Sequence, residues 1–232
     1  MMRALDIGTS LLASIARAGT GMQVVSLGPR PEQPLELYDF EACPFCRKVR
    51  EALSLLDLDA IVHPCPGGGP RFRPAVAERG GRSMFPYLVD PNTGIEMYES
   101  DDIVRYLFTT YGAGSPPWAL TTPIATDASS VLASLARPTR GRSYRKASSP
   151  RELLELWSFE ASPFCRLARE TLCELEIPYL LHNVAKGSPK REAFIARAGR
   201  MMVPYLADPN TGAEMFESAD ICAYLERTYA LG

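Results

Sequence analysis

Two cysteines with two residues between them, Cys43 and Cys46, are the side chains of this sequence best suited to covalent chemistry. They follow an alternating segment at residues 35–40, and Pro44 suits the first position of a helix because no N–H is needed there. We therefore predict that Cys43 lies at a helix N-terminus, where unpaired N–H groups and the helix dipole favour a thiolate. Cys46, one turn later, can resolve a mixed disulfide on Cys43, as thiol–disulfide exchange requires.

The residues around the motif bear on the same question. Arg47 and Lys48 follow Cys46 directly, and we expect their positive charges to stabilise the thiolate further. The alternative is half of a zinc site or two incidental thiols. The sequence has no second CxxC and only two histidines, so redox chemistry is favoured and no metal site is expected.

The motif belongs to a tandem repeat. The sequence LELYDFEACPFCRKVREAL, which starts at Leu35, recurs as LELWSFEASPFCRLARETL from Leu154. The sequence PYLVDPNTGIEMYESDDIVRYL, which starts at Pro86, recurs as PYLADPNTGAEMFESADICAYL from Pro204. A repeat of this kind decides the domain organisation of the chain.

The repeat also sets the domain boundaries. We predict one domain at residues 1–120 and a second at residues 121–232, because a Gly- and Pro-rich segment near residues 112–123 separates the copies. The upstream segments 10–16 and 130–136 are similar to each other as well. We therefore expect a short helix before each copy and not a cleaved targeting segment.

Hydrophobic periodicity and turn residues predict the order βαβ, helix, ββα within a copy. In the first copy, Ser100 is expected to be the N-cap of the last helix. The expected strands are residues 35–40, 60–63, 87–89 and 96–98, and the expected helices begin at Pro44, Phe72 and Ser100.

This arrangement resembles glutaredoxins and the N-terminal, thioredoxin-like domain of glutathione S-transferases. The resemblance rests on the CxxC motif, on Pro86 and on Glu99-Ser100, and it covers residues 35–111 and 154–229. It implies an α/β fold of two tandem thioredoxin-like domains, each with a mixed four-stranded sheet flanked by helices. The chain looks closest to the tandem proteins of this domain found in plastids and some bacteria.

The resemblance also implies a glutathione site in the first copy. In that family the proline follows a cis peptide bond, the residue before it hydrogen-bonds the cysteine of glutathione, and the Glu-Ser pair holds the γ-glutamyl end. A hydroxyl and helix N-terminal amides suit a carboxylate, while a glutamate suits an amino group. On this sequence the roles fall on Phe85, Pro86, Glu99 and Ser100.

The second copy replaces the attacking thiol by a hydroxyl, since Ser162 aligns with Cys43. A serine hydroxyl is far less acidic than a thiol and cannot serve as a redox nucleophile, so disulfide exchange is not expected there. Two alternatives stay open: this copy binds glutathione, or it is a structural remnant that pairs with the first. Its candidate glutathione-binding residues are Ser162, Cys165, Val203, Pro204, Glu217 and Ser218.

These observations favour a glutathione-dependent, glutaredoxin-like oxidoreductase acting on disulfides or glutathionylated thiols, in which Cys43 attacks and Cys46 resolves. One alternative is a tandem module that binds glutathione or a protein without turnover. Another is a glutathione transferase-like enzyme. The transferase alternative is weakened because neither copy is followed by the all-helical domain that transferases use for their second substrate.

Composition excludes several classes of protein. The 46% hydrophobic and 22% charged residues are typical of a globular protein, and no apolar run approaches the roughly 18 residues of a membrane helix, which excludes an integral membrane protein. A formal net charge of −2 gives no global field for nucleic acid, and six dilute cysteines indicate reduced thiols. We therefore expect a cytoplasmic protein, or one of the plastid stroma in a photosynthetic eukaryote.

Overall fold

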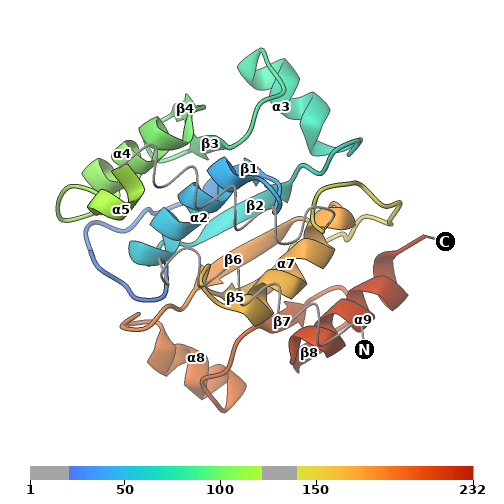
Figure 1. The fold of residues 1–232 in the computed structure, drawn as a ribbon. Helices are drawn as coiled ribbons and strands as arrows, with labels where there is room; N and C mark the ends of the chain where they lie inside the picture. The colour runs from blue at the N-terminus through green and yellow to red at the C-terminus, as the bar shows by residue number, and fades with distance from the viewer. Residues whose placement is uncertain (1–20, 122–139, 232) are drawn as a thin grey trace.

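Two copies of one α/β unit lie side by side in the computed structural model, which describes residues 21–121 and 140–231 (Figure 1). We name the first of these stretches unit one and the second unit two. The short helices expected at residues 10–16 and 130–136 lie outside the described residues.

Unit one follows the order that its periodicity predicts, with one further short helix, α5, at its end. Its elements are β1 (Leu35–Asp39), α2 (Pro44–Leu55), β2 (Ala60–Pro64), α3 (Phe72–Gly80), β3 (Tyr87–Asp90), β4 (Ile95–Met97), α4 (Ser100–Tyr111) and α5 (Trp118–Thr121). Unit two repeats the order with β5 (Leu154–Ser158), α7 (Pro163–Glu174), β6 (Tyr179–Asn183), α8 (Arg191–Ala198), β7 (Tyr205–Asp208), β8 (Ala213–Phe216) and α9 (Ser218–Tyr229). Among these helices, none is both long and apolar enough to span a bilayer.

One continuous sheet of eight strands runs through both units, in the order β4-β3-β1-β2-β6-β5-β7-β8. Each half is mixed, because β1 is parallel to β2 and antiparallel to β3, while β5 is parallel to β6 and antiparallel to β7. The halves join where β2 runs antiparallel to β6, with Ile61 opposite Leu180. The two expected four-stranded sheets are thus joined edge to edge, which leaves neither β2 nor β6 as an open edge.

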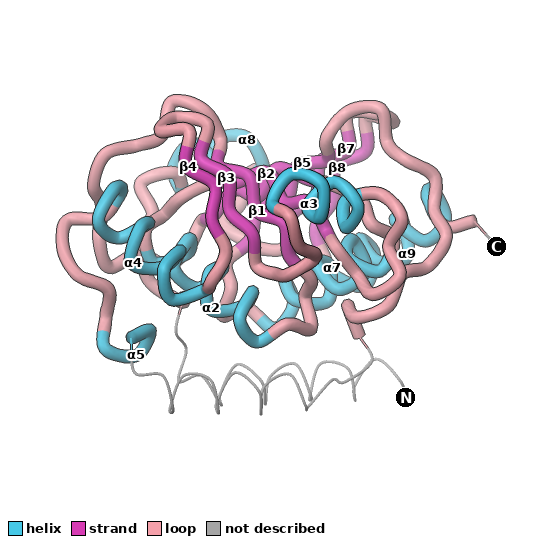
Figure 2. The backbone as a smooth tube through the Cα atoms, turned by 90° about the horizontal axis from the view of Figure 1, so that it is seen from above, coloured by secondary structure: helices cyan, strands magenta, loops and turns pink. Residues whose placement is uncertain are grey.

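Alternate residues of β1 face opposite layers, as the two-residue period of a strand requires. Leu35 and Leu37 pack with Leu53 of α2 in a fully buried core. Tyr38 packs on the other face with Val76 of α3. Figure 2 shows α2, α4, α7 and α9 together on one side of the sheet. The start of α2 therefore lies at the carboxyl end of β1, which places the motif cysteines at that end of the sheet.

In each unit, the segment that precedes the first strand pairs with the backbone of the other unit. Gln23 forms a parallel bridge with Lys186 of unit two, and Ser143 forms a parallel bridge with Gly67 of unit one. The two bridges are equivalent in the repeat, so the units are related by an approximate two-fold axis. Backbone pairing thus ties the units together on both sides of that axis.

Candidate functional site

The motif of unit one lies at the start of α2, as predicted. Cys43 precedes the helix with extended backbone angles (φ −76°, ψ 123°), and Pro44 is within its first turn. The Cys43 Sγ accepts a hydrogen bond from the Cys46 N–H, with 3.3 Å between sulfur and nitrogen. The thiol therefore takes the place of an N-cap oxygen, and a thiolate there is paired with a helix amide that has no partner within the helix.

The two thiols of the motif differ in acidity. Hydrogen bonding to the Cys46 side chain, reinforced by backbone N–H groups, outweighs burial and lowers the pKa of Cys43 below its ordinary value. Burial raises the pKa of Cys46 well above its ordinary value, and the hydrogen bond to Cys43 raises it further. Cys43 is 4% exposed and Cys46 is 0% exposed. The small exposure of Cys43 follows from its Sγ turning back onto the helix amide.

The positive charge near Cys43 comes from Arg50, which corrects the expectation that Arg47 and Lys48 supply it. Arg50 is among the groups that lower the pKa of Cys43. Arg47 is instead paired with carboxylates at the junction of the units, and Lys48 is paired with Asp101 of α4. The reason is the turn of about 100° per residue in a helix, which directs Arg47 and Lys48 toward other elements and Arg50 toward β1.

The loop before β3 lies beside the motif. The Phe85–Pro86 peptide bond is cis, as the resemblance leads us to expect. The Phe85 ring meets the Phe40 ring edge-on, with 6.3 Å between centroids, and the Phe40 carbonyl accepts the Cys43 N–H at 3.1 Å. The Arg73 guanidinium stacks over the Phe85 ring, 4.7 Å from its centroid. These contacts bring Phe85 and Pro86 next to the loop that carries Cys43.

The Glu-Ser pair begins the neighbouring helix. Glu99, and not the predicted Ser100, is the N-cap of α4, and its side chain makes no capping hydrogen bond. Its φ of 65° and ψ of 110° are uncommon for a residue other than glycine. The presence of a glutamate at this position in the sequence does not predict such backbone angles. The Glu99 side chain is 60% exposed, whereas Ser100 is buried. The ion pair between Lys48 and Asp101 holds the first turn of α4 against α2.

Unit two has the same backbone geometry at its motif, with Ser162 in the place of Cys43. The Ser162 Oγ accepts the Cys165 N–H at 3.3 Å at the start of α7. The Val203–Pro204 peptide bond is cis, and Glu217 before α9 has a φ of 65° and a ψ of 115°. Burial raises the pKa of the Cys165 thiol. Unit two therefore has the same local geometry without an acidic thiol.

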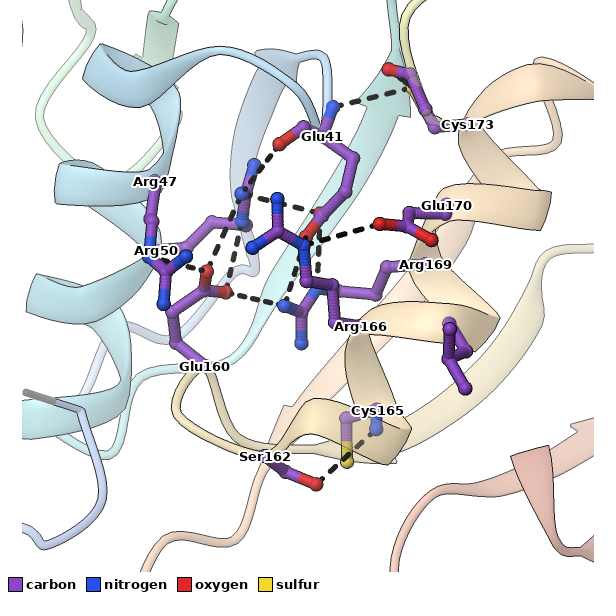
Figure 3. A network of polar contacts seen from close by, with 12 residues as sticks. Glu41, Arg47, Arg50, Glu160, Ser162, Cys165, Arg166, Arg169, Glu170 and Cys173 are labelled. Carbon is purple, nitrogen blue, oxygen red and sulfur yellow. Dashed lines mark hydrogen bonds and ion pairs between the residues drawn. The ribbon is translucent and has the colours of Figure 1, made fainter. Parts of the chain in front are cut away.

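A buried network of charges, which the sequence analysis does not predict, joins α2 to α7 (Figure 3). The Arg50 Nε donates to Glu160 of unit two at 3.0 Å, and the Arg169 Nε and Nη2 donate to Glu41 of unit one, each at 3.1 Å. All four side chains are buried, and we name them the interface cluster. Its signal in the sequence is that Glu41 and Arg50 recur as Glu160 and Arg169 at the same places around the motif.

The other cysteines form no second reactive pair. All six cysteines are free thiols. Burial raises the pKa of Cys65, Cys173 and Cys222, so Cys43 alone among the six has a lowered pKa. Across residues 21–121 and 140–231, no group of three or more His, Cys, Asp or Glu side chains is arranged to hold a metal ion.

Comparison with known proteins relates the fold to a family. The family model "Glutathione S-transferase, N-terminal domain" matches residues 37–117 and 156–231. Among solved structures, the glutathione transferase BmGSTD1 of Bombyx mori is 28% identical, with a TM-score of 0.33 over 37% of this chain and 39% of that chain. A structure of the same enzyme in complex with GTT gives the same values. The trimeric glutathione transferase TDR1 of Leishmania is 15% identical, with a TM-score of 0.30 over 86% of this chain and 68% of that chain.

The match to the family model places one domain in each unit. No curated protein matches the chain, and the alignment with BmGSTD1 spans 39% of that enzyme's length. The two matched segments together span more than half of the chain, and each contains a complete βαβ, helix, ββα unit apart from its first strand residues. The chain therefore belongs to the glutathione S-transferase N-terminal domain family and carries two thioredoxin-like copies of that domain in tandem.

Proposed function

We propose that the chain is a glutathione-dependent thiol–disulfide oxidoreductase whose reactive site is in unit one. The observation that carries this proposal is the hydrogen bond of 3.3 Å from the Cys46 N–H to the Cys43 Sγ, because it favours a thiolate at one cysteine of the pair. The pKa of Cys43 is lowered and that of Cys46 is raised. A nucleophilic thiolate beside a protonated second thiol is the arrangement that disulfide exchange uses.

The reaction begins when the Cys43 thiolate attacks one sulfur of a substrate disulfide. A bond forms between the two sulfurs, the substrate disulfide breaks, and the leaving thiolate takes the electron pair. The mixed disulfide is then resolved in one of two ways. Cys46 attacks the Cys43 sulfur to give a Cys43–Cys46 disulfide and releases the bound thiolate. Where the bound thiol is glutathione, a second glutathione thiolate attacks its sulfur instead, which gives oxidised glutathione and releases the Cys43 thiolate. A protein disulfide thus requires both cysteines, whereas a glutathionylated thiol requires Cys43 only.

Glutathione is proposed to lie across the N-termini of α2 and α4. Phe85, before the cis peptide bond, would pair with its cysteine backbone, as the family resemblance implies. The exposed Glu99 carboxylate suits the γ-glutamyl amino group, and the start of α4 at Ser100 suits the γ-glutamyl carboxylate. The 4% exposure of Cys43 favours a small or extended disulfide, such as a glutathionylated peptide, over one on a flat protein surface.

Unit two is proposed to bind glutathione without redox turnover. The supporting observation is that Glu217 keeps the uncommon backbone angles of Glu99 although Ser162 replaces the thiol. Such angles persist only where the surrounding structure determines them, and they cluster at ligand sites. A serine hydroxyl can donate a hydrogen bond to the glutathione thiolate, but it cannot form a disulfide with it.

Reduction of a glutathionylated peptide by glutathione tests the enzyme proposal. Cys43→Ser should abolish turnover, because no other described thiol has a lowered pKa. Cys46→Ser should retain most of it, because glutathione resolves the mixed disulfide. Cys222→Val is the matched control, since Val104 occupies the equivalent position of unit one, and it should leave turnover unchanged.

The same assay separates the competing functions. Equal loss of turnover in Cys43→Ser and Cys46→Ser would contradict the assigned roles. A parent protein that binds glutathione in a titration but reduces no disulfide would instead be a binding module. Conjugation of glutathione to an electrophile, undiminished in Cys43→Ser, would indicate a transferase.

A further inference from the structure

A segment of unit two lies against the motif loop of unit one. The Ala42 N–H, one residue before Cys43, donates to the Gly141 carbonyl at 3.3 Å. Gly141 has a φ of 64°, and a Cβ atom on it would lie 2.7 Å from the Glu41 Cβ, so only glycine fits this close approach. Residues 141–144 are therefore held beside the reactive motif of unit one, although they belong to unit two.

The same segment pairs with the loop that follows β2. The Gly67 N–H donates to the Arg142 carbonyl at 2.6 Å, and the Tyr144 N–H donates to the Gly67 carbonyl at 2.9 Å. Figure 1 shows this segment, in yellow, beside that loop. Backbone contacts on both sides thus fix Arg142 next to the motif loop and next to the loop after β2.

The Arg142 side chain has no partner within the protein. It is exposed, and it forms no hydrogen bond or ion pair with any residue that the structure describes. Two other arginines near this place are engaged. Arg71 donates to two backbone carbonyls of unit two. Arg73 donates to the backbone after β2 and stacks over the Phe85 ring. The guanidinium of Arg142 is therefore free to bind an anion.

Unit two has a cation at the equivalent place but takes it from a different residue. The Lys186 N–H donates to the Met22 carbonyl at 2.9 Å, and the Val24 N–H donates to the Lys186 carbonyl at 2.8 Å. Lys186, which is exposed, therefore takes the place of Gly67. Met22 takes the place of Arg142. In each of these backbone pairs one residue is a cation and the other is uncharged, but in unit one the cation is supplied by the other unit.

The order of the strands indicates which part of glutathione would meet Arg142. In the proposed arrangement the γ-glutamyl end lies at the start of α4, and the cysteine lies beside Phe85. The sheet of unit one runs in the order β4-β3-β1-β2. An extended tripeptide that begins at α4 and passes Cys43 therefore continues toward the end of β2, where Arg142 lies. Its glycyl end carries a free carboxylate, which a guanidinium binds with two parallel hydrogen bonds.

We propose that Arg142 of unit two binds the glycyl carboxylate of glutathione at the motif of unit one, an inference that rests on the proposed function. Unit two then completes the reactive site of unit one and determines its specificity, although the motif of unit two has no attacking thiol. The substrates that this contact selects are disulfides whose glutathione part ends in a free carboxylate. In unit two the same role falls on Lys186.

The reaction of Cys43 with two disulfides tests this contact in the Cys46→Ser protein. The Cys43 thiolate attacks oxidised glutathione, bonds to one sulfur and releases a glutathione thiolate, and the mixed disulfide persists and is measured by mass spectrometry. The second disulfide is oxidised glutathione in which both glycyl carboxylates are ethyl esters. We expect Arg142→Met to slow the reaction with oxidised glutathione about tenfold, as for the loss of one charge-assisted contact, and to leave the reaction with the ester unchanged.

Two further variants separate a contact with the substrate from an effect on the thiol or the fold. Gly67→Lys, added to Arg142→Met, introduces the arrangement of unit two and should restore most of the rate with oxidised glutathione. Lys146→Met removes another exposed cation of the same segment and should leave both rates unchanged.

Three results would overturn the proposal. Equal slowing with both disulfides would mean that Arg142 acts on the thiolate or on the fold. An unchanged rate in Arg142→Met would mean that the glycyl carboxylate does not meet this residue. A double variant that stays as slow as Arg142→Met would mean that a cation at this place is not what the substrate requires. A Cys46→Ser protein that forms no adduct with either disulfide would instead contradict the proposed function itself, and this inference with it.

Discussion

Unit one and unit two have the same backbone at their motif helices but different atoms at the position that would meet a disulfide. In both units an N-cap side chain accepts the N–H three residues later at 3.3 Å. Both have a cis peptide bond before the proline that precedes the third strand, and a glutamate with a φ of 65° before the last helix. The units differ at two positions near the motif. Unit one has the thiol of Cys43 where unit two has the hydroxyl of Ser162, and it has the carboxyl group of Asp39 where unit two has the hydroxyl of Ser158.

This comparison separates what the fold requires from what the chemistry requires. The features shared by the units do not depend on a thiol, because unit two keeps them without one. Ser218 is buried and Glu217 is exposed, as are Ser100 and Glu99 in unit one. The features confined to unit one are the Cys43 thiol with its lowered pKa and the buried Asp39, whose negative charge is among the groups that raise the pKa of Cys46.

The largest expected effect comes from breaking the interface cluster on either side. Glu41→Gln and Glu160→Gln each leave three buried arginines short of a carboxylate, and each should lower the free energy of unfolding by about 3–5 kcal/mol. The two losses should be similar because the contacts are equivalent in the repeat. Urea denaturation measures them.

A glutamate on the surface provides the control for the variants Glu41→Gln and Glu160→Gln. Glu152 uses its backbone and no side-chain atom in its contacts with Asn210, so Glu152→Gln should change stability by less than about 0.5 kcal/mol. A large loss in only one of the two cluster variants would show that the network is not equivalent in the two units.

The next effect is a difference in thiol reactivity between the motifs. Alkylation at neutral pH should modify Cys43 more than about tenfold faster than Cys165, because hydrogen bonding lowers the pKa of Cys43 whereas burial raises the pKa of Cys165. An arginine lowers the thiol pKa in both units, Arg50 at Cys43 and Arg169 at Cys165, so the difference is expected to come from the position of the thiol and its hydrogen bonds. Timed alkylation with peptide mapping measures both rates. Equal rates would mean that unit two exposes an activated thiol.

Local signals in the sequence predict each unit because they agree with one another. The alternation at residues 35–40 and the proline after Cys43 define the β1 to α2 connection, and the second copy repeats both. The candidate site residues lie at the ends of elements, where turn and cap residues indicate their positions. The local pattern therefore predicts that Cys43 lies at the start of α2, whereas the family resemblance is what assigns Pro86 and Glu99 to the same site.

The way the units meet depends on contacts that sequence periodicity does not contain. Glu41 and Arg50 look like part of a solvated charged segment, and only the packing of α2 against α7 shows that they are buried. Arg47 and Lys48 follow the motif directly, but carboxylates from distant segments determine where they point. A positive φ at Glu99 is likewise set by the chain around it.

A smaller effect is a pH dependence that belongs to unit one alone. The folded-state pKa of Asp39, about 6, lies above its ordinary value of 3.8, so the stability it contributes is present at low pH and is lost as pH rises from 3.8 to about 6. Asp39→Asn lacks this loss. Its free energy of unfolding relative to the parent should therefore rise by about 2 kcal/mol between pH 4 and pH 7, as denaturation at both pH values measures.

The matched change in unit two gives the reference for this prediction. Ser158 does not titrate, so the difference between Ser158→Ala and the parent should stay constant over the same pH range. A parallel rise in both variants would assign the pH dependence to the interface cluster, whose Glu160 has a pKa lowered to about 2 by Arg169 and Arg50.

The smallest expected difference lies on the surface, where each unit pairs an arginine of its second helix, α3 or α8, with a glutamate of its outer strand, β4 or β8. Arg79 donates to Glu96 at 2.8 Å, and Arg197 donates to Glu214 at 2.6 Å. Exposed pairs of this kind contribute about 0.2–1 kcal/mol. Arg197 also stacks over Trp157 at 5.0 Å, a contact that adds about 0.5 kcal/mol or more at an exposed site. Denaturation should therefore show Arg197→Gln to be less stable than Arg79→Gln by about that amount, and the reverse order would mean that the tryptophan in unit two contributes nothing through its arginine.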